Sequence, residues 1–262
     1  MSEIILDAKA ITKRFGGVVA VNGADLSVAK GQIVGLIGPN GSGKSTMVNL
    51  VTGELLPDSG AFRFNGVDIT RTPSYKRARL GMARSFQLLR LFNSLSVEDN
   101  MLLASHMRMK SSLLSSIIAG NAAARDEQAM RAKARELLDW FELGQFSERP
   151  VTALSIGQQR MVEIARGLMT QPSLFVLDEP AAGLSPPNVD RLIVLVRRLR
   201  DELGISVLLV EHVMKVVREL CDHVVVLDSG EKIAEGPPDV VVKDPVVVEA
   251  YIGSGWKRRA QA

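Results

Sequence analysis

The glycine-rich run at residues 38–46 constrains the fold of this chain more than any other feature of its sequence. The run matches the phosphate-binding pattern G-x-x-x-x-G-K-[ST] from Gly38 to Ser45. An apolar run over residues 33–37 precedes it and a helix-like stretch follows, so the expected order is buried strand, loop and helix. Glycines allow backbone N–H groups to face phosphate oxygens, and a helix N-terminus adds partial positive charge. The run therefore predicts a phosphate-binding loop in an α/β fold.

The residues of this loop have expected roles in binding a nucleotide. Lys44 is expected to reach the β- and γ-phosphates, and the Ser45 hydroxyl is expected to ligate Mg²⁺. The loop therefore predicts ATP and Mg²⁺ as cofactors. Its candidate nucleotide-binding residues are Gly38, Pro39, Asn40, Gly41, Ser42, Gly43, Lys44, Ser45 and Thr46.

A second apolar run, residues 174–177, ends in two carboxylates, Asp178 and Glu179. Carboxylates at the C-terminal end of a buried parallel strand face the crevice in which such folds bind ligands. We expect Asp178 to hold Mg²⁺ through water and Glu179 to polarise an attacking water. An exposed acidic loop after a core strand is the alternative, and the phosphate-binding loop upstream favours the catalytic interpretation.

The remaining pattern predicts a parallel sheet, an antiparallel β region and a helical insert. Residues 207–210 form a third continuously apolar run, which is typical of a strand buried on both faces. Residues 4–30 predict β structure that is broken at Gly16-Gly17 and at Asn22-Gly23, and Asn65-Gly66 predicts a tight hairpin turn.

We expect one domain over residues 1–253, with a helical insert at about 86–155, and a basic tail at 254–262. The tail contains three consecutive basic residues and so holds part of the net charge of +3. Such a tail is usually solvated, and contact with anionic lipid or nucleic acid is the alternative. Aromatic residues make up only 5%, which is poor for a base-stacking surface, so no nucleic-acid partner is expected.

Composition excludes several classes of protein. With 46% hydrophobic and 23% charged residues, the bulk of the 262-residue chain is neither disordered nor collagen-like nor a coiled coil. No apolar run reaches the roughly 18 residues of a membrane span, and the first residues lack the pattern of a secretory signal. The single cysteine, Cys221, excludes an intramolecular disulfide and is expected to be a small buried residue. These features predict a reducing, cytoplasmic location.

A family resemblance becomes evident at residues 154–160, which read Leu-Ser-Ile-Gly-Gln-Gln-Arg. This run is similar to the signature Leu-Ser-Gly-Gly-Gln of the ATP-binding subunits of ABC transporters, and the resemblance covers nearly the whole chain. It implies that Ser155, Gly157 and Gln158 contact the γ-phosphate of an ATP held by a second, head-to-tail subunit. Ile156 departs from the signature glycine. Because a β-branched residue is disfavoured at positive φ, we expect this position to be extended or helical.

Further motifs have roles that the resemblance implies. Gln87 matches the glutamine that contacts Mg²⁺ and senses the membrane partner, and His212 matches the switch histidine that contacts the γ-phosphate. Phe15 matches the aromatic residue that stacks on adenine, with a core aromatic as the alternative. Ser185 stands where the D-loop of the family usually ends in Asp. The resemblance thus implies Glu179, His212, Lys44 and Gln87 as catalytic residues, and Ser45, Gln87 and Asp178 as ligands of Mg²⁺.

A narrower resemblance, carried by runs such as residues 97–100, 163–166 and 250–253, is to importers of branched-chain amino acids. Urea and short-chain amide importers share much of it. The resemblance implies an α/β ABC ATPase at the cytoplasmic face of a membrane, coupling ATP hydrolysis to solute uptake. The implied partners are a second ATP-binding subunit, identical or paralogous, the integral membrane permease subunits and, indirectly, a solute-binding protein. The alternatives are non-transport ABC ATPases that act on nucleic acid or in iron–sulfur assembly.

Overall fold

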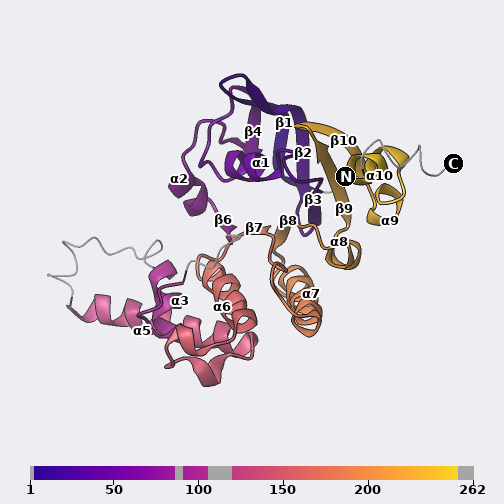
Figure 1. Cartoon of the computed structure of the whole chain (residues 1–262). Coiled ribbons are helices and arrows are strands. Elements are labelled where there is room, and N and C mark those ends of the chain that lie inside the picture. The colour runs from indigo at the N-terminus through magenta and orange to yellow at the C-terminus, as the bar shows by residue number, and fades with distance from the viewer. Residues whose placement is uncertain (1–2, 86–90, 106–119, 253–262) are drawn as a thin grey trace.

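The computed structural model describes residues 3–85, 91–105 and 120–252, which form two β-sheets with surrounding helices (Figure 1). The six-stranded sheet has the strand order β10-β9-β3-β8-β7-β6. Its strands are β3 (Ile33–Ile37), β6 (Met82–Arg84), β7 (Leu174–Asp178), β8 (Ser206–Val210), β9 (His223–Asp228) and β10 (Glu231–Gly236). The four-stranded sheet, ordered β2-β1-β4-β5, contains β1 (Ile4–Phe15), β2 (Val18–Ala29), β4 (Ser59–Phe64) and β5 (Val67–Asp68).

The helices of the described residues surround these sheets. They are α1 (Lys44–Val51), α2 (Ser74–Arg79), α3 (Val97–Ser105), α5 (Gly120–Trp140), α6 (Ile156–Leu168), α7 (Pro186–Asp201), α8 (Met214–Leu220), α9 (Pro238–Val241) and α10 (Pro245–Ile252). Short 3-10 helices cover Gly144–Phe146 and Val151–Ala153.

The apolar runs that the sequence predicts as buried strands form the centre of the larger sheet. β3 pairs in parallel with β8 and β9, and β8 pairs in parallel with β7. Every residue of β3, β7 and β8 is buried. The carboxyl ends of parallel strands meet at one edge, so the loops that follow β3, β7 and β8 begin close together. The predicted α/β fold is confirmed, and its topology gathers the candidate site residues at this edge.

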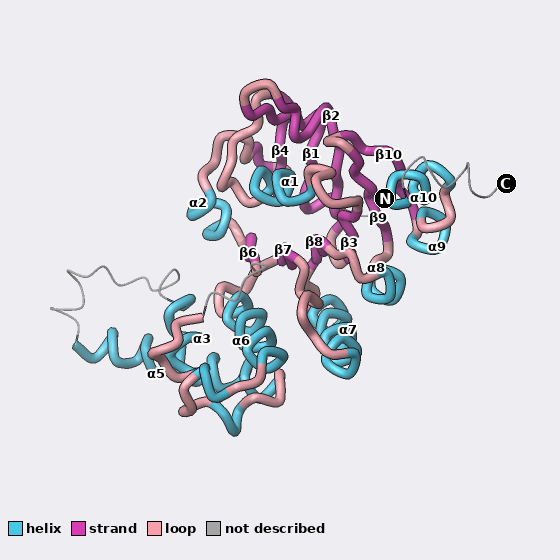
Figure 2. Tube along the Cα trace, viewed as in Figure 1, coloured by secondary structure: helices cyan, strands magenta, loops and turns pink. Residues whose placement is uncertain are grey.

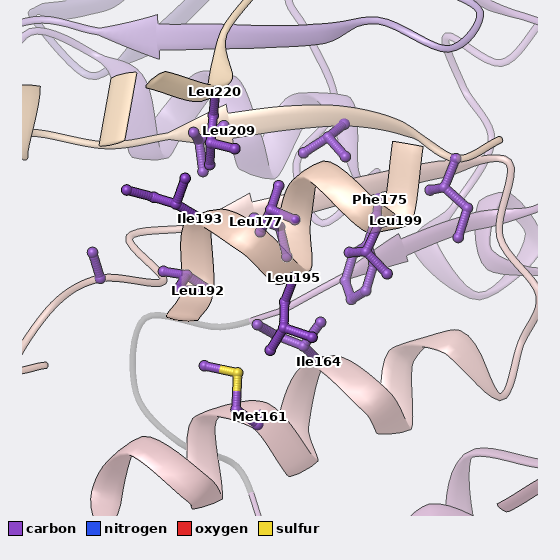
Figure 3. Close-up of a cluster of buried hydrophobic side chains, with 14 of the residues drawn as sticks. Met161, Ile164, Phe175, Leu177, Leu192, Ile193, Leu195, Leu199, Leu209 and Leu220 are labelled. Atoms are coloured by element: carbon purple, nitrogen blue, oxygen red, sulfur yellow. The ribbon is translucent and has the colours of Figure 1, made fainter. Parts of the chain in front are cut away.

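The two faces of the six-stranded sheet belong to two separate hydrophobic cores, because successive side chains of a strand point to opposite faces. Phe175 and Leu177 of β7 and Leu209 of β8 pack with side chains of α6, α7 and α8 (Figure 3). Val176 of β7 and Leu208 of β8 belong to the other core, with α1 and the antiparallel sheet. The central strands are therefore covered on both faces, which anchors the loops at their ends.

The antiparallel sheet corrects one expectation from the sequence. Asn22-Gly23 does not break the β structure, because β2 continues through the pair and remains paired with β1 on both sides. Gly23 adopts φ +59° and donates its N–H to the Thr12 hydroxyl at 3.0 Å. The pairing of β1 with β2 therefore continues past the glycine with a local shift in register. The turns at Gly16-Gly17 and Asn65-Gly66 are confirmed, and the latter joins β4 to β5.

α3, α5 and α6 pack together and lie below the sheets in the view of Figure 2. The buried Glu98 of α3 accepts hydrogen bonds from Arg131 and Arg135 of α5, at 3.2 and 3.1 Å. Across the three ranges described, no helix combines the length and the apolar character needed to cross a membrane. The division into a domain, an insert and a tail stays a prediction, since residues 86–90, 106–119 and 253–262 lie outside the described residues.

Cys221 is a buried cysteine, as the sequence predicts. Its sulfur packs on β3, where a Cβ added to Gly35 would lie 2.8 Å from Sγ. Burial, reinforced by the charges of Asp222 and Glu211, raises the pKa of the thiol to about 12. Because only the thiolate attacks disulfide reagents, the native protein should react with Ellman's reagent at about pH 8 at least about 100-fold more slowly than free cysteine. Full reaction in guanidinium chloride is the control, and rapid labelling of the folded chain would contradict the buried position.

Candidate nucleotide-binding and hydrolysis site

The predicted phosphate-binding loop connects the end of β3 to the start of α1. Gly43 precedes α1 with φ +101°, and a Cβ there would collide with the carbonyl oxygen of Ala20. Only glycine fits this position without strain. The loop borders a groove of about 410 Å³. The groove is lined by Val18, Val19, Ala20, Gly41, Ser42, Gly43, Lys44, Ser45, Thr46 and Ser229.

Lys44 is largely buried and its ammonium is held by the loop itself. Nζ donates hydrogen bonds to the carbonyl oxygens of Gly38 and Pro39, at 2.7 and 2.8 Å, and lies 3.4 Å from the Ser42 hydroxyl. Burial lowers the pKa of Lys44, and the nearby charge of Glu179 opposes part of this shift. The three oxygens around Nζ are uncharged, so an anionic phosphate in the groove would provide charge compensation. The residues present therefore fit a nucleotide phosphate.

Asp178, at the end of β7, is held by β6. Its Oδ2 accepts a hydrogen bond from the Arg84 guanidinium at 2.9 Å, and its backbone N–H donates to the Ser85 hydroxyl at 3.3 Å. Arg84 also donates to Asn49 of α1 at 2.7 Å, which connects the carboxylate to the helix after the phosphate-binding loop. Mg²⁺ prefers carboxylate, hydroxyl, water and phosphate oxygens and takes few ligands from the protein. The donor chemistry of Asp178 and Ser45 fits this ion.

Glu179 and His212 lie next to each other at the ends of β7 and β8. Oε2 of Glu179 is 3.8 Å from Nδ1 of His212, and both side chains are partly accessible. The neighbouring strands bring them together, because β7 and β8 pair in register up to Asp178 and Val210. Glu179 has φ +47°, an uncommon conformation for a residue with a side chain. Two residues predicted to serve hydrolysis are thus neighbours in the folded chain.

Phe15 ends β1 and pairs with Val18, which lines the groove. The residue is 48% exposed, so Phe15 is not a core aromatic. The Lys13 ammonium lies 5.7 Å from the ring centroid. An accessible ring beside the groove is compatible with adenine stacking, which stays a prediction.

The signature residues lie at the N-terminus of α6, a helix that is apart from α1 in Figure 1, and they do not line the groove of their own chain. Ser155 and Gln158 form a reciprocal cap, in which Ser155 Oγ accepts the Gln158 N–H at 3.3 Å and Gln158 Oε1 accepts the Ser155 N–H at 2.9 Å. Ile156 begins α6, so its predicted helical or extended conformation is confirmed. Gly157 also has a packing role, because a Cβ there would lie 2.7 Å from Nδ2 of Asn188.

Gln87 lies outside the described residues. Two residues near the site, Arg84 and Glu211, were not identified from the sequence. Arg84 holds Asp178, as described above. Glu211 is fully buried directly before His212, and its carboxylate accepts three backbone N–H groups. For Glu211 the available signal was a carboxylate directly after an apolar strand, the same pattern that singles out Asp178 and Glu179.

Comparisons with known proteins agree with this geometry. Residues 21–182 match the family described as ABC transporter, and residues 231–257 match the family described as branched-chain amino acid ATP-binding cassette transporter. The high-affinity branched-chain amino acid transport ATP-binding protein BraF of Pseudomonas aeruginosa is 42% identical, over 97% of this chain and 99% of its own length.

Solved structures give the same result for the fold. An ATP-binding cassette of an ABC transporter, solved in its ADP conformation, is 36% identical to this chain and has a TM-score of 0.84. The match covers 97% of this chain and 100% of the cassette. A dimeric bacterial ABC transporter cassette is 25% identical with a TM-score of 0.75, over 89% of this chain and 98% of its own. The chain therefore belongs to the ABC transporter family, as an ATP-binding subunit with ATPase activity.

Proposed function

We propose that this chain couples ATP hydrolysis to the import of branched-chain amino acids, as a peripheral subunit at the cytoplasmic face of a membrane. The observation that carries the choice of solute is the match of residues 231–257 to the branched-chain amino acid transporter family. The name of the Pseudomonas relative supports the same solute class. Urea and short-chain amides are the competing solutes.

The phosphate-binding loop would hold the triphosphate of ATP through its backbone N–H groups and the Lys44 ammonium, and Phe15 would stack on the adenine. Ser45, Asp178 and Gln87 would hold Mg²⁺, which when bound supplies positive charge to the β- and γ-phosphate oxygens. Ordered donors at fixed positions stabilise the charge of the transition state without reorganising during the reaction.

Glu179 would accept a hydrogen bond from the attacking water and so orient it toward the γ-phosphate. His212 would donate a hydrogen bond to a γ-phosphate oxygen. Their separation of 3.8 Å supports a shared role, since the water and the phosphate oxygen that they contact are themselves adjacent in a hydrolysis reaction. Aligning the nucleophile with the phosphate is the main contribution that a protein makes to phosphoryl transfer.

A second ATP-binding subunit would complete the site with its own Ser155, Gly157 and Gln158. The N-terminus of α6, where these residues lie, carries partial positive charge suited to a γ-phosphate. The dimeric relative supports a pair of subunits. The second subunit is either a copy of this chain or a paralogue, and closure of the pair on ATP would drive the permease subunits.

The solute is tested by reconstituting this chain in proteoliposomes with its permease subunits and a solute-binding protein. Labelled leucine, urea and acetamide are compared, with and without ATP inside the vesicles. ATP-dependent uptake of leucine alone is expected. Uptake of urea or acetamide instead would replace the solute assignment. Purification of the chain with ribosomes or nucleic acid, and without permeases, would favour a non-transport ATPase.

The segment from about residue 86 to residue 100 is proposed to dock on the permease. Phe92 supports this role, because the residue is 55% exposed while its backbone N–H and carbonyl are hydrogen-bonded to the Asn100 amide at 2.8 and 3.1 Å. An exposed aromatic side chain on a fixed backbone suits an interface anchor. Gln87, Leu88 and Leu89, which also belong to the proposed surface, lie outside the described residues.

Single cysteines at Arg90, Phe92 and Ser94, in a Cys221→Ser background, should cross-link to cytoplasmic loops of the permease. A cysteine at Val194, which is 53% exposed on α7, is the matched control and should not cross-link. An intact, ATPase-active complex in which none of the three cysteines cross-links would place the docking surface elsewhere.

A further inference from the structure

Glu211 connects the two loops that carry Glu179 and His212. Its Oε1 accepts a hydrogen bond from the N–H of Ala181 at 2.8 Å, in the loop after β7. Its Oε2 accepts the N–H groups of His212 and Val213, both at 3.0 Å, in the loop after β8. The residue has no exposed surface, so water does not compete for these bonds. One buried carboxylate therefore joins the backbones on either side of the proposed catalytic pair.

The backbone around Glu179 needs such support. At φ +47° the residue occupies the left-handed region, which an L residue with a side chain adopts only when its surroundings hold it there. The N–H of Glu179 donates to the carbonyl oxygen of Val210 at 2.9 Å, which fixes the residue from the β8 side. The bond from Ala181 to Glu211 fixes the chain two residues later. Both supports come from adjacent residues at the end of β8.

We propose that Glu211 is a positioning residue that sets the geometry of the Glu179 carboxylate relative to the His212 imidazole. This inference rests on the hydrolytic roles proposed above for these two residues. Glu211 itself is enclosed by protein, and its carboxylate accepts hydrogen bonds from three backbone N–H groups. It therefore acts through its neighbours and not on ATP. Small displacements of a reacting group lower the reaction rate by large factors, so a residue that holds this geometry should affect kcat.

The hydrogen bonds that Glu211 accepts from the two loops require a carboxylate. Both oxygens of Glu211 accept hydrogen bonds, one from each loop. A glutamine of the same shape offers one acceptor oxygen and one NH₂ donor. The NH₂ group would therefore face either the Ala181 N–H or the N–H pair of His212 and Val213, donor against donor. A buried donor without an acceptor is strongly unfavourable, so the loop that faces the NH₂ group should move.

The test measures kcat and KM for ATP, nucleotide affinity and the thermal midpoint on the reconstituted transporter. Glu211→Gln is expected to lower kcat by at least about 10-fold, with KM and nucleotide affinity changed less than about threefold. Glu211→Asp keeps two acceptor oxygens and should retain more kcat than the glutamine variant. In a His212→Ala background, Glu211→Gln should lower kcat by a smaller factor than in the wild-type protein, because one of the two residues being positioned is absent.

Glu163→Gln is the matched control, because it neutralises another buried glutamate, one that pairs with Arg160 at 2.7 Å on α6. It should lower the thermal midpoint and leave kcat of the folded protein unchanged. Glu211→Gln with kcat within about twofold of wild type, or with its full effect retained in the His212→Ala background, would overturn the inference. If His212→Ala itself keeps wild-type kcat, the proposed role of His212 is wrong. If His212→Ala lowers kcat and Glu211→Gln does not, only the inference about Glu211 fails.

Discussion

Lys44→Ala is expected to lower ATP turnover by at least about 100-fold. The ammonium is the buried positive charge of the phosphate-binding loop, and its partners there are the uncharged oxygens of Gly38, Pro39 and Ser42. Alanine removes both the charge for the phosphates and the hydrogen bonds that hold the loop in shape. Phosphate release measures turnover. Nucleotide affinity reports the loss of the charge for the phosphates, and the thermal midpoint reports the loss of the hydrogen bonds that hold the loop.

Lys30→Ala is the control for the loss of a lysine, because Lys30 is exposed and its salt bridge is with Glu3, outside the groove. It should leave turnover at the wild-type rate. Near-normal phosphate release by a folded Lys44→Ala protein would contradict the assignment of residues 38–46 as the phosphate-binding loop.

Glu179→Gln is expected to retain ATP binding and to lower hydrolysis by about 100- to 10,000-fold, the usual contribution of a positioned general base. The amide has the size of the carboxylate but cannot take up a proton from water. With hydrolysis blocked, ATP should hold two subunits together, and an ATP-bound dimer should appear on size-exclusion chromatography, with the paralogue added if the pair is mixed.

Glu235→Gln offers a closely matched control. Oε2 of Glu235 lies 3.7 Å from Nε2 of His223, nearly the same separation as in the Glu179–His212 pair, but on the β9–β10 hairpin. This variant should hydrolyse ATP at the wild-type rate. Loss of nucleotide binding in Glu179→Gln, with hydrolysis lowered only in proportion, would show that Glu179 is structural.

Local residue order determined the elements of the site. The apolar runs at 33–37, 174–177 and 207–210 predict strands buried on both faces, and the structure has β3, β7 and β8 there. The glycines before Lys44 predict a loop between strand and helix, because few other residues allow the required backbone. Such features depend on neighbours within a few residues along the chain, so periodicity and residue type suffice to find them.

Tertiary structure alone decided which of these residues meet. The 3.8 Å approach of Glu179 to His212 follows from the parallel pairing of β7 with β8, which no spacing along the chain prescribes. The same pairing carries the Ala181 N–H to Glu211, and the pairing of β6 with β7 carries Arg84 to Asp178. At Asn22-Gly23, the ladder with β1 outweighed the local turn preference. Long-range hydrogen bonds and packing set these outcomes, and their energies depend on partners distant in sequence.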